Sequence, residues 1–245
     1  MSSIPINIGT AQRQSASLGK TIQLNPTRRT ASDDVFDYLH VNIIAMNIQP
    51  GTKMSETEIA KQFGVSRQPV REAFIRLADM RLLEIRPQRA TVVRKIHGQE
   101  ILDARFVRTA LEVEVARHAC LKYDGRYDDD FAANLALQRD CMERVDFDKF
   151  HGLDYEFHKL ICITAETEFA FRTVVENKSH VDRLCALSLS TKEHFKDVIE
   201  DHSKIFEFIR QQNEVELVAA LRAHLSRLDG TIANVRAAHG EYFED

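Results

Sequence analysis

Apolar positions recur every three or four residues along most of the chain, and this spacing predicts a protein built mainly from helices. The first apolar face consists of Val35, Leu39, Ile43 and Met46. The run Gln49-Pro50-Gly51 then ends this first helix, because proline and glycine both interrupt helical backbone. The N-terminal part of the chain is therefore expected to begin with one amphipathic helix.

Two shorter helices separated by a tight turn follow. Ser55 and Glu58 have the spacing of a capping box, which predicts that a second helix begins here and ends near Phe63. Gly64-Val65 forms the predicted turn, and Ser66 is placed to cap a third helix. The apolar face of that third helix consists of Val70, Ala73, Phe74 and Leu77. Two short helices across a glycine turn indicate a helix-turn-helix.

Two β-prone runs directly after the third helix predict a hairpin. Residues 82–86 and 91–94 are rich in branched apolar side chains, and residues 87–90 separate them. A hairpin at this place forms a wing. We therefore predict a winged helix-turn-helix, with three helices and a β-hairpin wing, over residues 31–95.

The helical pattern returns from Gln99 to about Arg236 and predicts an all-α helical-bundle domain over residues 98–238. The six helices predicted for it are Ile101 to Leu121, Phe131 to Met142, Phe147 to Thr164, Phe169 to Leu189, Phe195 to Arg210 and Val215 to Val235. Residues 1–30 have little apolar content and are expected to form a flexible tail. The expected fold class is thus mainly α.

Composition restricts the cellular setting. No run approaches the roughly 18 consecutive apolar residues that a membrane span needs, and the N-terminus lacks the apolar core of a signal peptide. We therefore expect a cytoplasmic protein with no membrane partner. The four cysteines stand far apart without a C-x-x-C pair, so they are expected to be reduced thiols.

Charge is divided unevenly along the chain. The net charge is −4, but the first 95 residues hold 14 Lys and Arg against 8 Asp and Glu, whereas the remaining 150 residues hold 19 against 29. A basic head on an acidic body is typical of a protein that binds DNA through one domain only.

The third helix carries the side chains expected to read DNA. Arg67, Gln68 and Arg71 lie in its first turn and a half, from which side chains of a recognition helix reach base edges in the major groove. Ser66 at the helix N-terminus suits a phosphate, and Arg89 at the hairpin tip suits a wing contact. The alternative is that these arginines form a solvated helix face.

This region resembles the winged helix-turn-helix of the GntR family of bacterial regulators from about residue 33 to 94. The resemblance is carried by Gln49-Pro50-Gly51, Glu58-Ile59-Ala60, the run from Phe63 to Ala73, Leu77, Leu83 and Arg86-Pro87-Gln88-Arg89. It implies DNA contacts for Ser66, Arg67, Gln68 and Arg71, a phosphate contact near Thr57, and a wing position for Arg89. Ala90 departs from the family, which often has glycine there, so the wing tip is less free to approach the DNA backbone.

Three helices of the second half carry polar residues where their apolar faces should be unbroken. Asp154 and His158 are one turn apart, while His202 and His224 interrupt the faces of two later helices. One Asp and three His that converge from facing helices suit a divalent cation, most readily zinc, with nickel or manganese as alternatives. Taken singly, each histidine is better explained as a core residue hydrogen-bonded to a neighbour, and only the four residues taken together favour a metal site.

The second half resembles the FadR-like effector domain called FCD, over about residues 98–238. The residues that carry this resemblance are Arg108-x-x-Leu111-Glu112, Asp154-x-x-x-His158, Asp182-Arg183-Leu184, Asp201-His202 and Ala223-His224-Leu225. It implies that Asp154, His158, His202 and His224 ligate the metal ion and that Arg108 meets a carboxylate effector. Arg108 can equally form a structural ion pair with Glu112 at i,i+4.

Together these features predict a transcriptional regulator whose operator affinity responds to a small organic acid. We expect two subunits to pair through their helical domains on a pseudo-palindromic double-stranded operator, with repression as the commoner behaviour in the family. A metal-dependent hydrolase is the main alternative, but the sequence offers no further acid/base residue near the predicted ligands and no phosphate-binding glycine loop. A DNA-binding structural protein without a ligand would leave the buried polar cluster without a purpose.

Overall fold

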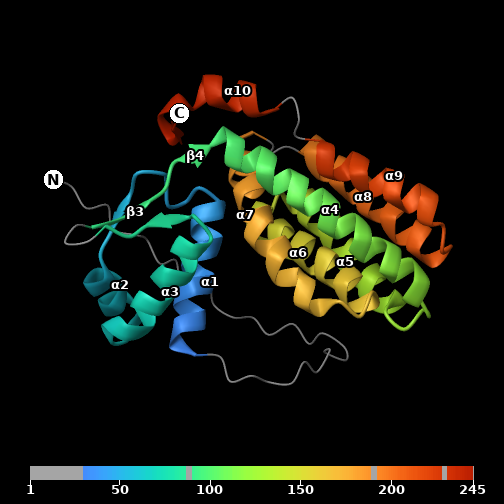
Figure 1. Cartoon of the computed structure of the whole chain (residues 1–245), viewed down its shortest axis with the longest axis horizontal. Helices are drawn as coiled ribbons and strands as arrows, with labels where there is room; N and C mark the ends of the chain where they lie inside the picture. The colour runs from blue at the N-terminus through green and yellow to red at the C-terminus, as the bar shows by residue number, and fades with distance from the viewer. Residues whose placement is uncertain (1–29, 87–89, 189–191, 228–230, 245) are drawn as a thin grey trace. The chain divides into compact units, whose positions relative to one another are not determined.

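The computed structural model describes residues 30–86, 90–188, 192–227 and 231–244. The predicted tail, residues 1–30, therefore lies outside the described residues except for Thr30, and so does Arg89 at the predicted wing tip. The described residues are mainly helical, with a three-stranded sheet in the N-terminal part and a pair of short strands after it (Figure 1).

The N-terminal part is a winged helix-turn-helix. Its elements are α1 (Ala31–Ile44), β1 (Lys53–Met54), α2 (Glu56–Phe63), α3 (Arg67–Asp79), β2 (Leu83–Glu84) and β3 (Thr91–Val93). Strands β2 and β3 pair antiparallel with Leu83 opposite Val93, which confirms the predicted hairpin. Strand β1 adds to the other side of β3, and this third strand was not predicted because two residues carry no periodic signal.

The turn between α2 and α3 depends on a glycine. Gly64 has a φ of 65°, in the left-handed region that glycine adopts without steric cost, and it ends α2. Ser55 and Ser66 are the N-cap residues of α2 and α3, as predicted. Neither hydroxyl makes a capping hydrogen bond, so the predicted side-chain capping bonds are wrong, and the Ser66 hydroxyl is exposed at the N-terminus of α3.

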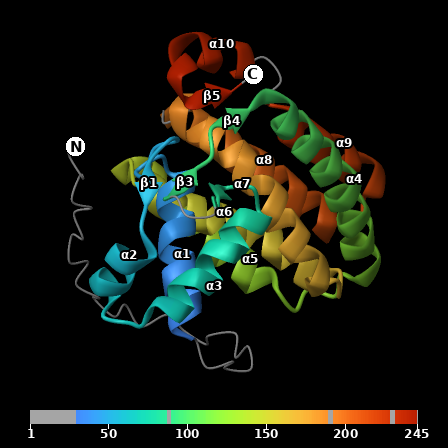
Figure 2. The same cartoon turned by 60° about the vertical axis from the view of Figure 1, so that its left-hand side comes forward.

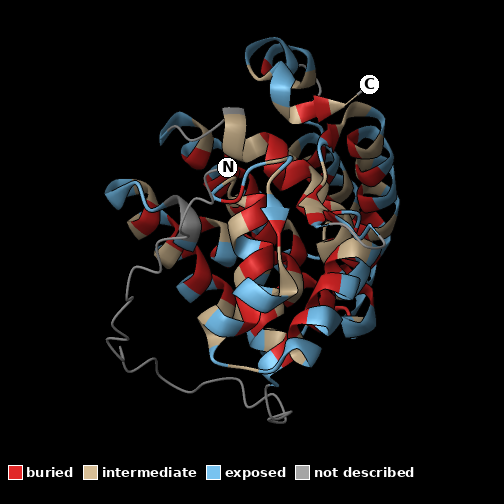
Figure 3. Ribbon diagram, turned by 90° about the vertical axis from the view of Figure 1, so that its left-hand side faces the viewer, coloured by how far each residue is buried: buried red, intermediate tan, exposed pale blue. Residues whose placement is uncertain are grey.

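The second part of the chain is a bundle of six long helices. They are α4 (Gly98–Lys122), α5 (Asp128–Arg144), α6 (Phe147–Thr164), α7 (Phe171–Ser188), α8 (Lys192–Arg210) and α9 (Glu214–Ser226). Helix α4 packs against α7 and α9, and α5 packs against α6 and α8 (Figure 2). Buried positions lie on the sides of the helices that face their neighbours, and exposed positions face outward (Figure 3). The main core of the bundle includes Phe131, Phe157, Ile205, Leu217 and Leu221.

The last predicted helix is wrong in length. Helix α9 ends at Ser226, and a separate helix, α10 (Thr231–Ala238), follows the undescribed residues 228–230. Beyond α10, the short strand β5 (Phe243–Glu244) pairs parallel with β4 (Ile96–His97) at the start of the bundle. The chain thus returns to the junction between its two parts. The short 3-10 helices η1 (Glu168–Ala170) and η2 (Gly240–Tyr242) complete the described elements.

Helix α1 of the winged helix-turn-helix (residues 31–93, called the head below) also contacts the bundle. His40 of α1 lies 2.7 Å from the hydroxyl of Ser179 on α7, measured from its Nε2, and both residues are buried. A cavity of about 330 Å³ lies beside this contact, lined by α1, α6 and α7. Among the described residues, no helix combines the length and the apolarity needed to cross a membrane.

Candidate functional site

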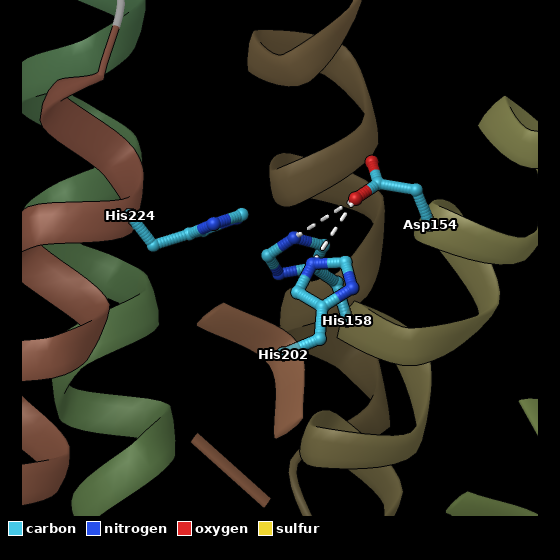
Figure 4. Close-up of side chains that lie close together, drawn as sticks. All are labelled: Asp154, His158, His202 and His224. Atoms are coloured by element: carbon cyan, nitrogen blue, oxygen red, sulfur yellow. Dashed lines mark ion pairs between the residues drawn. The ribbon is translucent and has the colours of Figure 1, made fainter. Parts of the chain in front are cut away.

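The four polar residues that interrupt the apolar faces meet in the interior of the bundle. Asp154 and His158 project from one face of α6, His202 projects from α8, and His224 projects from α9 (Figure 4). One potential ligand atom from each of the four lies within 4.8 Å of those of the other three. The bundle therefore brings together side chains that are up to 70 positions apart in sequence and builds a candidate metal site.

The shortest separation between the ligand atoms matches that of two ligands on one small cation, and the others are longer. Oδ1 of Asp154 lies 3.2 Å from Nε2 of His202 and 3.9 Å from Nε2 of His158. Two ligands bound to one zinc ion at ordinary bond lengths stand about 3 to 3.5 Å apart. The Nε2 atoms of His158 and His202 are buried and have no hydrogen-bond partner among the described residues. A cation between them would satisfy both nitrogens at once.

A carboxylate or amide oxygen outside the cluster lies near the far nitrogen of each histidine, although Nδ1 of His158 has no hydrogen bond of proper geometry with the described residues. Nδ1 of His202 lies 2.9 Å from Oε1 of Gln138. Nδ1 of His158 lies 2.6 Å from Oε2 of Glu112, and Nδ1 of His224 lies 3.4 Å from Oδ2 of Asp201. A proton on Nδ1 that faces such an acceptor leaves the Nε2 lone pair directed into the cluster, which is the arrangement that metal-ligating histidines use.

Burial keeps the imidazoles in the form that binds metals. It lowers the pKa of His202 to about 3, although the neighbouring Asp154 acts in the opposite direction. Burial also lowers the pKa of His224, against the effect of Asp201. Both rings are therefore neutral near pH 7, and neutral imidazole is the ligand form.

The carboxylate of the cluster is held charged by a buried lysine. Burial alone would raise the pKa of Asp154, but the buried Lys178 holds it well below its usual range. Nζ of Lys178 lies 2.5 Å from Oδ2 of Asp154 and 2.7 Å from Oδ1 of Asp182. Asp154 therefore presents its other oxygen, Oδ1, to the histidines.

A cavity of about 70 Å³ adjoins the cluster. Its lining includes Arg108, Asp154, His158, Lys178, Asp182 and His224. Nε of Arg108 donates to Oε1 of Glu112 at 2.7 Å, so the predicted i,i+4 ion pair is present. Arg108 also lines the cavity. Its ion pair with Glu112 therefore does not prevent it from contacting a ligand bound in the cavity.

The second candidate surface lies on α3. Ser66, Arg67, Gln68 and Arg71 are exposed on its first two turns, and Thr57 is exposed on α2. Arg67 is tied to Glu56 of α2 by an ion pair of 2.8 Å. The apolar side of α3 is buried in the head, where Val70, Ala73, Phe74 and Leu77 lie. The polar first turns are thus free to meet a large partner.

Several residues of the site were not singled out from the sequence. Gln138, Lys178 and Asp182 lie on helices that contribute no ligand to the cluster, and only packing brings them to it. Asp182 belongs to a run that carries the family resemblance, but its spacing in the sequence did not predict that it would lie beside the cluster. His151 and His194, which formed no grouping in the sequence, line the same cavity.

Comparison with known proteins agrees with both parts of the structure. Residues 31–93 match the family model of "Bacterial regulatory proteins, gntR family", and residues 101–227 match the FCD domain model. The transcriptional repressor RspR of Escherichia coli is 33% identical over 223 residues, which are 91% of this chain and 97% of that repressor. The gluconate operon transcriptional repressor of Bacillus licheniformis is 22% identical over 202 residues, covering 80% and 83% of the two chains.

A solved structure shows the same fold. The E. coli protein McbR/YncC superimposes with a TM-score of 0.74 at 15% identity, over 86% of this chain and 99% of that one. The two curated relatives named above are transcriptional regulators and not enzymes. With family models matched in both parts, the chain belongs to the GntR family of helix-turn-helix transcriptional regulators, in the FadR-like group that carries an FCD domain.

Proposed function

We propose that this protein is a dimeric repressor whose operator affinity is set by a small carboxylic acid bound beside a divalent metal ion in the FCD domain. The observation that carries the proposal is the cluster of one carboxylate and three histidines inside the bundle, next to a cavity that Arg108 lines. Two relatives named as repressors support the direction of regulation.

Zinc is the proposed ion, with nickel or manganese as alternatives. Asp154, His158, His202 and His224 would hold it, and three imidazole nitrogens with one carboxylate oxygen suit all three metals. A bound divalent ion supplies positive charge and an open position for an oxygen atom of a ligand.

A carboxylic acid is the proposed effector because of the cavity's cations. Arg108 lies in the cavity wall and has guanidinium donors beyond the one used by Glu112. One relative is named for the gluconate operon, and gluconate is itself a carboxylate. Arg108 would bind the acid together with the metal ion, and differential binding to two arrangements of the bundle would alter operator affinity.

The proposed DNA contacts lie on the head. Arg67, Gln68 and Arg71 of α3 would read base edges, and Ser66 and Thr57 would contact phosphates. All five side chains are exposed in the structure. Arg89 lies outside the described residues, and its wing contact rests on the family resemblance.

Pairing of two subunits is proposed to use the outer face of α4. Leu102, Phe106 and Val107 are exposed there, and Phe106 is 75% exposed. Leu102 and Phe106 are one helical turn apart, so they form a continuous apolar strip that a second copy of the same strip can cover. Light scattering should show a dimer for the wild type and a monomer for Phe106→Glu. The control is Phe169→Glu, since Phe169 is 83% exposed on η1 and is not part of the strip of Leu102 and Phe106.

The experiment that tests the function combines metal analysis with ligand screening. Purified wild-type protein should contain about one metal per chain, and small carboxylic acids should raise its melting temperature. The variant His202→Ala should contain less metal and lose the response to acids while it still binds DNA. Wild-type protein without metal and without any acid response would contradict the sensing role.

A further inference from the structure

One oxygen atom in the cavity wall lacks a partner. Asp182 of α7 is 3% exposed and lines the cavity beside the candidate metal site. Its Oδ1 accepts from Nζ of Lys178 at 2.7 Å, whereas its Oδ2 is buried and has no hydrogen-bond partner among the described residues. A buried carboxylate oxygen without a donor is costly, so it calls for a donor from outside the protein.

Lys178 is not available as that donor. Its ammonium group already contacts Oδ2 of Asp154 at 2.5 Å and Oδ1 of Asp182 at 2.7 Å, and it lies 4.4 Å from the centre of the Tyr155 ring. Asp154 and Asp182 hold the pKa of Lys178 above its usual range, although burial acts to lower it. Lys178 therefore remains a fixed positive charge between the two carboxylates.

The charges around the cavity limit the charge of a ligand. The cations at its wall are Arg108, Lys178 and Arg227, and the carboxylates that pair with them or line it are Glu112, Asp154, Asp182, Asp197 and Asp201. The five carboxylates exceed the three cations by two negative charges. A divalent ion in the cluster balances these charges, so every further carboxylate group on a ligand adds an uncompensated negative charge.

We propose that Asp182 selects the effector: its Oδ2 accepts a hydrogen bond from a hydroxyl group of the ligand, so the site prefers a hydroxy monocarboxylate. This inference rests on the proposed carboxylate-sensing function and names the second group that the acid carries. A second carboxylate on the ligand would face the Asp182 carboxylate. An ammonium group in its place would lie beside Lys178, which already contacts the same side chain. A neutral hydroxyl satisfies the oxygen without either repulsion.

The protein contains one competing donor near Asp182. The hydroxyl of Tyr155 is buried close to Asp182 and Ser179, but it makes no hydrogen bond of proper geometry with the described residues. Burial and the negative charge of Asp182 raise the pKa of Tyr155 well above its usual value, so this phenol keeps its proton. The variant Tyr155→Phe removes the competing donor and leaves the ligand's hydroxyl in place.

Acids that differ only in their second end group provide the test. We would measure binding of butanoate, 4-hydroxybutanoate, 4-aminobutanoate and succinate, and of their three-carbon counterparts, to metal-loaded full-length protein by calorimetry and thermal shift. The hydroxy acid of at least one series should bind about tenfold more tightly than its methyl, ammonium and dicarboxylate analogues, because only it pairs the buried oxygen. Tyr155→Phe should keep this order.

The matched variant Asp182→Asn removes the charge and the free acceptor at nearly constant volume. It should lose the preference for the hydroxy acid and bind the dicarboxylate about tenfold more tightly than the wild type does, since the negative charge that repels the second carboxylate is then removed. Metal analysis and circular dichroism would confirm that this variant is folded and loaded.

The outcomes separate this inference from the proposed function. If wild-type protein binds the methyl and hydroxyl analogues equally in both series, the role of Asp182 is overturned while carboxylate sensing stands, and this result needs no variant. Loss of the hydroxyl preference in Tyr155→Phe, or an unchanged order in Asp182→Asn, would also overturn it. If none of these acids binds the metal-loaded wild type, the inference and the carboxylate effector on which it rests both fail.

Discussion

Helix α3 and the histidine cluster place their polar side chains in opposite environments, one exposed to solvent and the other buried. On α3 the polar side chains are exposed, and their contacts within the protein are a few surface pairs such as Arg67 with Glu56, which solvent weakens. In the bundle, by contrast, Asp154, His158 and His202 are almost fully buried and each is contacted by a further polar side chain. The side chains proposed to contact DNA thus have few contacts within the protein, whereas the residues proposed to hold a metal ion are contacted by several neighbouring side chains.

Substitutions on α3 should therefore change binding without changing stability, whereas substitutions in the cluster should change both. A change on the first turns of α3 should remove only the proposed contacts to DNA. A change in the cluster leaves a buried charge or a buried donor without its partner, so it should affect folding as well as ligand binding.

The largest effect is expected for Asp154→Ala. The substitution removes a proposed metal ligand and one of the two carboxylates that neutralise the buried Lys178. Breaking a buried ion pair in this way costs about 3–5 kcal/mol, so the free energy of unfolding in urea should fall by that amount and the metal should be lost. Asp129→Ala, at an exposed position on α5, is the control and should leave the metal content unchanged and the free energy of unfolding nearly so. Full metal content in Asp154→Ala would show that the cluster is not the site.

The second-largest effect is expected for Arg71→Ala, which should change the affinity for DNA and not the stability of the protein. Arg71→Ala should weaken binding to the operator by about 1–3 kcal/mol if Arg71 reads a base, with the unfolding free energy unchanged. Fluorescence anisotropy at fixed ionic strength measures the affinity. Arg172→Ala, on the exposed surface of α7, controls for the loss of one positive charge. Equal affinities for the two variants would contradict the assignment of α3.

A smaller effect should come from a residue that orients a ligand without binding the metal. Gln138→Leu removes the acceptor that faces Nδ1 of His202. Loss of such a partner lowers metal affinity about 10–100-fold, which a competition titration with a chromogenic chelator would detect. Gln211→Leu, at an exposed position at the end of α8, should leave the metal affinity unchanged. If Gln138→Leu binds metal like the wild type, Gln138 does not position the ligand.

The smallest effect concerns pH and the contact between head and bundle. Burial lowers the pKa of His40 to about 4, with Asp182 acting against this shift. Because the unfolded imidazole has a pKa near 6.5, the unfolded state binds more protons between these values, and stability present above pH 6.5 is lost as the pH falls toward 4.

The variant His40→Gln should therefore lose about 1 kcal/mol less stability than the wild type between pH 7.5 and pH 5.5. Urea unfolding at the two pH values measures the difference. His118→Gln is the control, because His118 lies on the exposed face of α4. Identical losses in His40→Gln and the wild type would mean that His40 is not buried in its neutral form.

The sequence could predict the elements whose signal is local. The caps, the turn at Gly64 and the apolar faces are local patterns, and they placed α1 to α3 and most of the bundle. Asp154, His158, His202 and His224 were identifiable because each breaks an apolar face of its own helix. Their meeting at one point was an expectation, and the structure brings them together.

Features that depend on distant packing could not be predicted. The pairing of β4 with β5 joins residues 96 and 243, and each strand is two residues long, so neither carries a pattern. The end of α9 at Ser226 was missed because apolar residues continue at helical spacing beyond it. Gln138 and Lys178 belong to the site only through the way their helices pack, which no spacing within one helix reveals.

The most direct test of the account is the operator affinity of metal-loaded protein before and after an acid is bound. The operator would be a duplex that the protein selects from a random library, and the acid would be the one that stabilises the protein most. The account predicts that the wild type changes its affinity at least about fivefold and that His202→Ala binds the operator without responding. An acid that binds the wild type and leaves operator affinity unchanged would contradict the account.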